Sequence, residues 1–220
     1  KTDKNPNILV ILIDDAGYND FGFMGSKEMQ TPNIDALTSE GVVFTDAHVA
    51  ATVSSPSRAC LITGRYGHRF GYECNLSDRT NGLPLEEETI AEVFKTNGYR
   101  TAAIGKWHLG SRDEQHPNNR GFDLFYGMKA GGRDYFYNEK KSDRPGDERN
   151  LLLNDRQVKF EKYLTDAFSE KAVEFINESS QPFMMYLAYN AVHTPMQATD
   201  EDMAKFEEHP RQKLAAMTYA

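Results

Sequence analysis

Mostly apolar runs of strand length alternate along the chain with segments whose apolar residues recur at helical spacing. The three longest runs are rich in aliphatic, aromatic and β-branched side chains and cover residues 7–13, 99–105 and 182–189. Runs without polar alternation are typical of parallel strands that are buried on both faces of a sheet. Residues 42–44 predict one further short strand.

Four segments between these runs carry helix signals, and they cover residues 32–40, 56–63, 86–97 and 165–176. Glycines follow the first three, and Pro56 fits the first helical position of the second. Strands that alternate with helices predict an α/β fold, with a mostly parallel central sheet and helices on both faces. The polar residues 131–155 are expected to form long loops over the sheet edge.

Composition narrows the class of protein. At 220 residues and 39% hydrophobic content, the chain can bury a core of one domain or a large part of one. A net charge of −8 argues against a broad nucleic-acid or anionic-membrane surface, and no apolar run reaches membrane-spanning length. The cysteines, Cys60 and Cys74, match no metal spacing, and Cys60 is expected to be a small buried side chain.

Polar side chains follow three of the predicted strands, where ligands bind in open α/β sheets. Asp14 and Asp15 close the first strand, Lys106 and His108 follow the second, and His193 follows the third. Adjacent carboxylates repel each other unless a cation lies between them, and their oxygens suit Ca²⁺ or Mg²⁺. The same aspartates are also good turn residues, so both interpretations stay open at this point.

The stretch SSPSRACLITGR, residues 54–65, combines small hydroxyl residues with an arginine at a helix start. Free backbone N–H groups and the helix dipole favour anions there, and Arg58 can point back toward Ser54 from the next turn. An ordinary serine cap beside a solvated arginine is the alternative. His193 could likewise be a turn residue, and the remaining histidines are expected to be structural or exposed, namely His48, His68, His116 and His209.

Together these segments resemble the type I, formylglycine-dependent sulfatases of the alkaline phosphatase-like superfamily. The resemblance rests on Ser-x-Pro-Ser-Arg at residues 54–58 with Thr-Gly at 63–64, the Asp14-Asp15 pair, GKWHLG at 105–110 and NAVHTP at 190–195, in the family's order. It runs from about residue 7 to the end. It implies that residues 1–220 are the N-terminal portion of a sulfatase catalytic domain, without the family's later metal-ligand segment.

The resemblance also implies a mechanism. Ser54 would be converted to formylglycine, whose hydrated aldehyde attacks sulfur, with Arg58 and a Ca²⁺ ion (Mg²⁺ is the alternative) stabilising the oxyanion. Asp14, Asp15 and residue 54 would hold that ion. Lys106 and His193 would contact the sulfate and the bridging oxygen, His193 would protonate the departing alcohol, and His108 would take the proton that allows sulfate to leave.

The loops at residues 67–75 and 131–137 look similar to those of carbohydrate sulfatases, which implies a sulfated saccharide substrate bound in part by Arg133. Simple loop packing is the alternative. The resemblance further implies a sulfatase-maturing enzyme as partner and export to a bacterial periplasm or cell surface. Two other functions compete: a phosphomonoesterase or phosphonate hydrolase of the same superfamily, and an inactive module that binds sulfated glycans.

Overall fold

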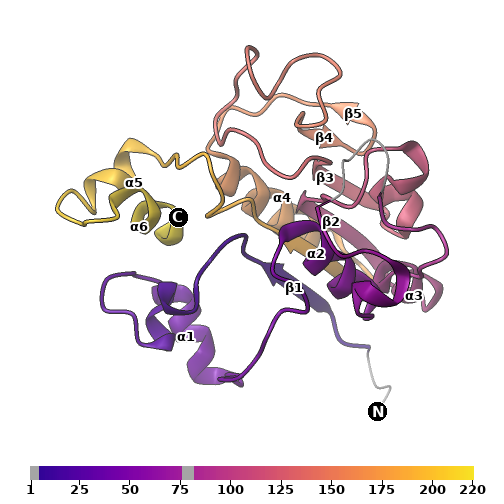
Figure 1. Cartoon of the computed structure of the whole chain (residues 1–220), viewed down its shortest axis with the longest axis horizontal. Helices are drawn as coiled ribbons and strands as arrows, with labels where there is room; N and C mark the ends of the chain where they lie inside the picture. Colours follow the sequence, from indigo (N-terminus) through magenta and orange to yellow (C-terminus); the bar gives the residue numbers. More distant parts are fainter. Residues whose placement is uncertain (1–4, 76–81) are drawn as a thin grey trace.

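A single mixed sheet runs through the computed structural model, which describes residues 5–75 and 82–220 (Figure 1). In this part of the chain the sheet has six strands in the order β1-β6-β2-β3-β4-β5. The first four in that order are parallel and the last two pair antiparallel. Their bounds are β1 Ile8–Leu12, β2 Arg100–Lys106, β3 Leu124–Met128, β4 Leu152–Leu153, β5 Arg156–Gln157 and β6 Phe183–Ala188. The mostly parallel sheet is therefore confirmed.

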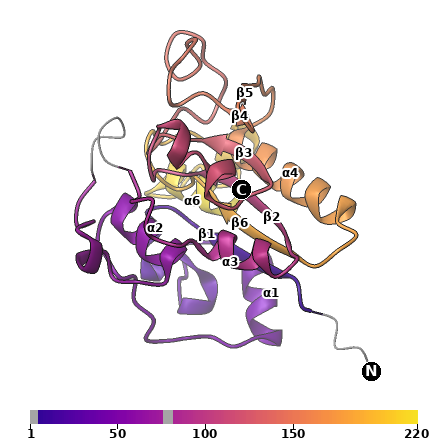
Figure 2. The same cartoon turned by 90° about the vertical axis from the view of Figure 1, so that its right-hand side faces the viewer.

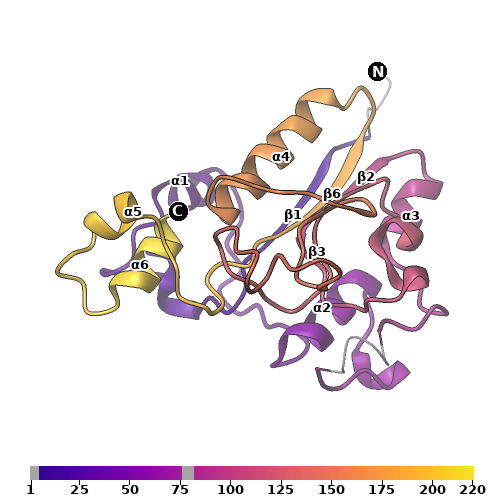
Figure 3. The same ribbon diagram turned by 90° about the horizontal axis from the view of Figure 1, so that it is seen from above.

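Helices cover both faces of the sheet, as predicted (Figure 3). Helix α4, Leu164–Glu178, packs on one face, and α2, Ser54–Thr63, packs with α3, Ile90–Thr96, on the other. Successive β6 residues divide between the layers, because side chains alternate across a strand. Met185 belongs to the core with α4, and Tyr186 to the core with α2 and α3.

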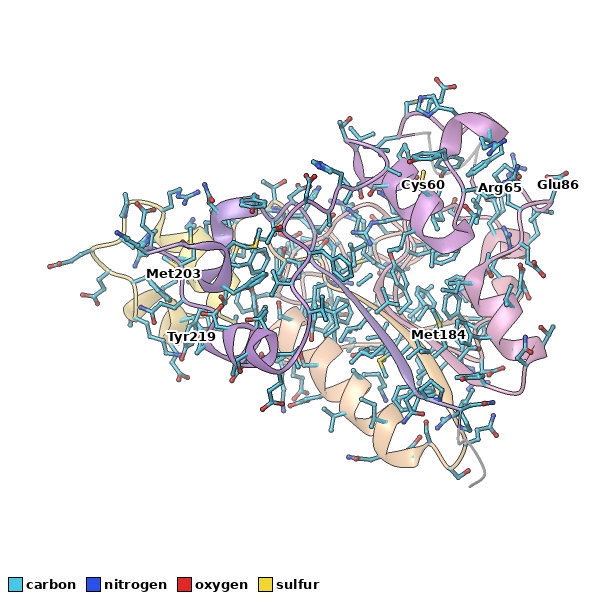
Figure 4. The ribbon with its side chains drawn as sticks, turned by 90° about the horizontal axis from the view of Figure 1, so that it is seen from below. Cys60, Arg65, Glu86, Met184, Met203 and Tyr219 are labelled. Atoms are coloured by element: carbon cyan, nitrogen blue, oxygen red, sulfur yellow. The ribbon has the colours of Figure 1, made fainter. Side chains whose placement is uncertain are left out.

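A small third cluster joins the segment before α1, Pro32–Glu40, to the C-terminal part of the chain. Helices α5, Asp200–Ala204, and α6, Gln212–Tyr219, pack near α1 (Figure 1). Figure 4 shows Met203 and Tyr219 at this end of the molecule, far from Cys60 on α2. The core of this third cluster is formed by Met29, Phe206, Ala215 and Ala216.

Two helix starts differ from prediction. Helix α3 begins at Ile90, four residues late, because Thr89 forms a capping box in which its hydroxyl accepts from the Glu92 N–H at 3.1 Å and its own N–H donates to the Glu92 carboxylate at 2.7 Å. Helix α2 begins at Ser54 with Val53 as its cap, so Pro56 lies at the third helical position. Helix α1 has the predicted bounds.

The strand predicted at residues 42–44 is wrong: this segment is irregular, with Val42 81% and Phe44 76% exposed. Strand β3 was not anticipated. The expectation that β1 is buried on both faces is also wrong, because in the described chain β1 lies at the sheet edge and Leu9 and Ile11 are 44% and 51% exposed. Composition predicted a strand there but could not predict its neighbours.

The predicted loops at residues 131–155 extend beyond the sheet edge, with the two short strands β4 and β5 at their end (Figure 2). Cys60 is buried as expected and its sulfur accepts the Gly67 N–H at 3.1 Å, whereas Cys74 is exposed, and both thiols are free. In the described chain, none of the helices combines the length and apolar character needed to cross a membrane.

Candidate active site

The carboxyl ends of β1, β2 and β6 meet the start of α2 at one place. Asp14 follows β1, and its backbone is tied to the segment after β6: its N–H donates to the Ala191 carbonyl at 2.8 Å and its carbonyl accepts from Val192 at 2.7 Å. Lys106 is the last residue of β2, and Arg58 is one turn into α2. The carboxyl ends of the parallel strands therefore bring Asp14, Arg58 and Lys106 together.

Asp14, Arg58 and Lys106 form a buried charged cluster. The Asp14 carboxylate accepts from Arg58 Nη2 at 2.9 Å and from Lys106 Nζ at 2.5 Å, and the three side chains are between 0 and 6% exposed. Burial alone would raise the pKa of Asp14, yet the two cations hold that pKa below its ordinary value. Burial and the neighbouring Arg58 lower the pKa of Lys106 to about 8, although Asp14 opposes the shift.

Ser54 lies between a cation and an imidazole. Arg58 Nε donates to Ser54 Oγ at 3.2 Å, and His108 Nδ1 lies 3.1 Å from the same oxygen. Burial, with Lys106 and Arg58 adding to it, lowers the pKa of His108 to about 3, so the ring is neutral near pH 7. In the tautomer with Nδ1 unprotonated, His108 can accept a proton from residue 54 while Arg58 stabilises the resulting negative charge.

Hydrogen bonds hold these two partners of Ser54 in place. Tyr186 Oη accepts from Arg58 Nη1 at 3.1 Å inside the core. The buried Ser55 hydroxyl donates to the His108 carbonyl at 2.7 Å and lies 2.7 Å from Tyr72 Oη. The sequence analysis missed these supporting residues, although a tyrosine within a buried strand is itself a signal, because its hydroxyl needs a partner.

His193 lies at the rim of the cluster rather than in it. Its Nε2 is 3.8 Å from the Asp15 carboxylate, and its Nδ1 lies 2.6 Å from the Thr194 carbonyl, so that Nδ1 carries the proton in the neutral ring. Tyr135 Oη lies 2.8 Å from the His193 carbonyl and donates to it, and it also reaches the Asn190 carbonyl at 2.6 Å. The His193 side chain is 28% exposed, which leaves Nε2 accessible from outside.

A cavity of about 210 Å³ brings Asp14, Asp15 and Ser54 to one space beside Arg58. Its oxygen donors are of the type that Ca²⁺ or Mg²⁺ prefers. In the described ranges, however, there is no group of three His, Cys, Asp or Glu side chains placed to hold a metal, and the Asp14 oxygens already bind Arg58 and Lys106. The donors fit such an ion in chemistry and would supply part of its coordination shell.

Arg133 lies apart from this cluster, in the wall of a cavity of about 580 Å³ that also contains His193. Its side chain is fully buried, binds both oxygens of Asp143 at 2.7 and 2.8 Å, and stacks on Phe160 with 4.6 Å between the guanidinium carbon and the ring centroid. The buried Arg133 guanidinium thus supports the cavity wall through its ion pair with Asp143. Direct contact between Arg133 and a sugar stays a prediction.

A buried cluster of charged side chains beside a serine, at the strand ends of an α/β sheet, is a candidate active site, and comparison with known proteins identifies the family of the chain. Residues 6–219 match the Sulfatase family, so the chain belongs to that family. Mouse arylsulfatase G is 38% identical over 88% of this chain and 42% of its own length, and human N-acetylgalactosamine-6-sulfatase is 32% identical over 88% and 41%.

Solved structures agree in fold. The crystal structure of Ps i-CgsB is 44% identical with a TM-score of 0.91, covering 98% of this chain and 52% of that one, and the protein is also known in complex with k-i-k-neocarrahexaose. BT4656, bound to its substrate D-glucosamine-2-N,6-O-disulfate, is 27% identical with a TM-score of 0.76, covering 93% of this chain and 38% of its own. The chain therefore spans about two fifths of the two curated relatives and about half of Ps i-CgsB.

Proposed function

We propose that the protein hydrolyses sulfate esters at Ser54. The observation that supports this most is the position of Ser54 Oγ, between the Arg58 guanidinium and a neutral His108 and in one cavity with Asp14. Membership of the Sulfatase family supports sulfate ester hydrolysis as the reaction. The geometry supports it separately, because converging positive charges stabilise a tetrahedral anion such as sulfate.

Each side chain has a role that follows from its surroundings. Arg58 and Lys106 attract the sulfate group and stabilise negative charge as it develops. His108, neutral because of burial, accepts a proton from residue 54. His193 presents Nε2 at the rim, where a leaving alcohol would depart. Because the Thr194 carbonyl holds the Nδ1 proton, Nε2 donates a proton to that alcohol from the imidazolium form of the ring, which carries protons on both nitrogens.

Two further groups belong to the proposal. Ser54 matured to formylglycine would supply, on hydration, two hydroxyls on one carbon. Asp14, Asp15 and residue 54 would hold Ca²⁺, with Mg²⁺ as the alternative, and the ion would add positive charge at a sulfate oxygen. The maturing partner would be a sulfatase-maturing enzyme, and the place of action a bacterial periplasm or cell surface.

The proposed substrate is a sulfated saccharide. The cavity beside His193 is lined by Lys141 and Arg149, whose side chains are 63% and 41% exposed, together with the backbone of Gly132. Exposed cations and amides at a cavity wall suit the hydroxyl and sulfate groups of a sugar. Ps i-CgsB and BT4656, which were crystallised with saccharides, support this class.

Sulfate release tests the proposal. The full protein, with and without an aldehyde at residue 54, would be incubated with sulfated oligosaccharides and with a sulfate and a phosphate ester of the same phenol. We expect sulfate release from the matured form alone and slower hydrolysis of the phosphate ester. Faster hydrolysis of the phosphate ester would indicate a phosphatase, and tight saccharide binding without any release would indicate a binding module.

A further inference from the structure

Two consecutive glycines, Gly131 and Gly132, lie against the two imidazoles of the site. We propose that this pair is a positioning element: Gly131 sets the ring of His108 and Gly132 sets the ring of His193. The inference rests on the proposed function for its catalytic consequence, whereas the placement of the rings is a property of the fold.

Gly131 leaves no room beside His108 for any side chain. A Cβ atom added there would lie 2.6 Å from both Cε1 and Nε2 of His108, and 3.0 Å from Nδ1. Ordinary contacts between carbon atoms are about 3.5–4.0 Å, so these positions overlap. One face of the ring, on its Cε1–Nε2 side, therefore lies against Gly131, while Nδ1 lies 3.1 Å from Ser54 Oγ.

Gly132 makes the equivalent but looser contact with His193. A Cβ atom there would lie 3.1 Å from Cε1 and 3.2 Å from Nδ1 of His193, with the Thr194 carbonyl oxygen next at 3.7 Å. These distances are tight rather than overlapping, so a displacement of a few tenths of an ångström would relieve them. An added methyl group should therefore displace the His108 ring strongly at Gly131 and the His193 ring only slightly at Gly132.

The need for glycine here comes from the rings and not from the backbone. Neither Gly131 nor Gly132 has a left-handed φ, so alanine can adopt their conformations. Gly105 is different, with φ of 106° and a Cβ position 1.9 Å from a backbone oxygen. At Gly131 and Gly132 the nearest obstacles are imidazole atoms, which lie at the far end of a rotatable side chain.

The backbone of each histidine is held, so the ring has to yield. His108 donates its N–H to the Lys129 carbonyl at 3.0 Å and accepts from Ser55 at its own carbonyl. His193 donates its N–H to the Asn190 carbonyl at 2.9 Å and accepts from Tyr135. A methyl group at either glycine would thus rotate the imidazole and leave the main chain in place.

The test compares Gly131→Ala, Gly132→Ala and the control Gly41→Ala, whose added Cβ would lie 3.4 Å from the Leu37 carbonyl oxygen and far from both rings. The first readout is the set of imidazole Cε1–H nuclear magnetic resonance signals in the full protein with an unmodified Ser54, assigned with His108→Ala and His193→Ala. We expect Gly131→Ala to shift the His108 signal, Gly132→Ala to shift the His193 signal by less, and the control to shift neither.

Sulfate release by the matured protein is the second readout. A misplacement of about 1 Å at a reacting group can cost on the order of 10²-fold in rate. We therefore expect kcat to fall by about that factor in Gly131→Ala, with KM little changed, and by less in Gly132→Ala. Unshifted imidazole signals, or a shift spread over the whole spectrum, would overturn the inference. A wild-type protein that releases no sulfate would instead contradict the proposed function. The nuclear magnetic resonance test would still decide whether Gly131 and Gly132 position the two imidazole rings.

Discussion

Ser55→Ala gives the clearest test of how the fold holds His108. Ser55 is 1% exposed, and its hydroxyl donates to the His108 carbonyl at 2.7 Å and pairs with Tyr72 Oη at 2.7 Å. The bond to His108 joins residues 53 positions apart in sequence. His108 itself has φ of 56°, a left-handed conformation that costs a residue other than glycine about 1–3 kcal/mol. Its neighbours therefore have to hold it there.

The magnitude follows from the bonds removed. Loss of a buried hydrogen-bonding partner costs about 1–3 kcal/mol, so we expect Ser55→Ala to lower the free energy of unfolding by that amount. Tyr72→Phe removes the contact between the two hydroxyls, which contributes about 0.5–1.5 kcal/mol. Because both single variants lose that contact, the double variant should be more stable than additivity predicts by about 0.5–1.5 kcal/mol.

Urea unfolding of the two single variants and the double variant measures this coupling. Ser39→Ala is a matched control, because the exposed Ser39 hydroxyl bonds only within its own helix, to the Ala36 carbonyl at 2.6 Å. Its effect should stay within about 0.5 kcal/mol. A loss below about 0.5 kcal/mol for Ser55→Ala, or strict additivity in the double variant, would refute the view that Ser55 and Tyr72 together hold the His108 backbone.

Two further predictions concern stability. Burial holds the pKa of His116 below 6.5, so the unfolded chain binds the proton more readily; the free energy of unfolding should fall as pH drops below about 6.5. His116→Gln should weaken that fall, and an unchanged pH profile in urea unfolding would contradict the assignment. Asp143→Asn leaves the fully buried Arg133 without its anion and should cost about 3–5 kcal/mol. Adding Arg133→Met should recover part of it, and equal stability of the single and double variants would argue against the ion pair as the cause.

Much of the fold could be predicted from local patterns. Residues 182–189 are apolar throughout and residues 99–105 are apolar apart from Arg100 and Thr101, and both segments form interior strands whose side chains reach the two cores. The same composition at residues 7–13 also predicted a strand, but β1 exposes Leu9 and Ile11. Secondary structure follows from local side-chain chemistry, whereas burial depends on which elements lie beside a strand.

The start of α3 was missed for a different reason. Thr89 and Glu92 are spaced as a capping box, so the signal was present in the sequence, but the acidic residues before it suggested an earlier first turn. The segment at residues 42–44 is the opposite case, since its β-branched residues favour a strand, but within residues 5–75 and 82–220 no strand pairs with it. A strand needs a neighbouring strand to bind its backbone N–H and C=O groups. The high β-propensity of three residues does not provide that neighbour.

The amino-acid sequence by itself determined which residues are candidates for the chemistry. The strand-end rule and the Ser-x-Pro-Ser-Arg motif identified Asp14, Ser54, Arg58 and Lys106, and the structure brings these four together. Only the tertiary structure decided the partners, charge state and position of each candidate side chain. It paired Asp14 with two cations, made His108 neutral by burial and placed glycines under two rings, because charge state and ring position depend on groups that are distant in sequence and adjacent in space.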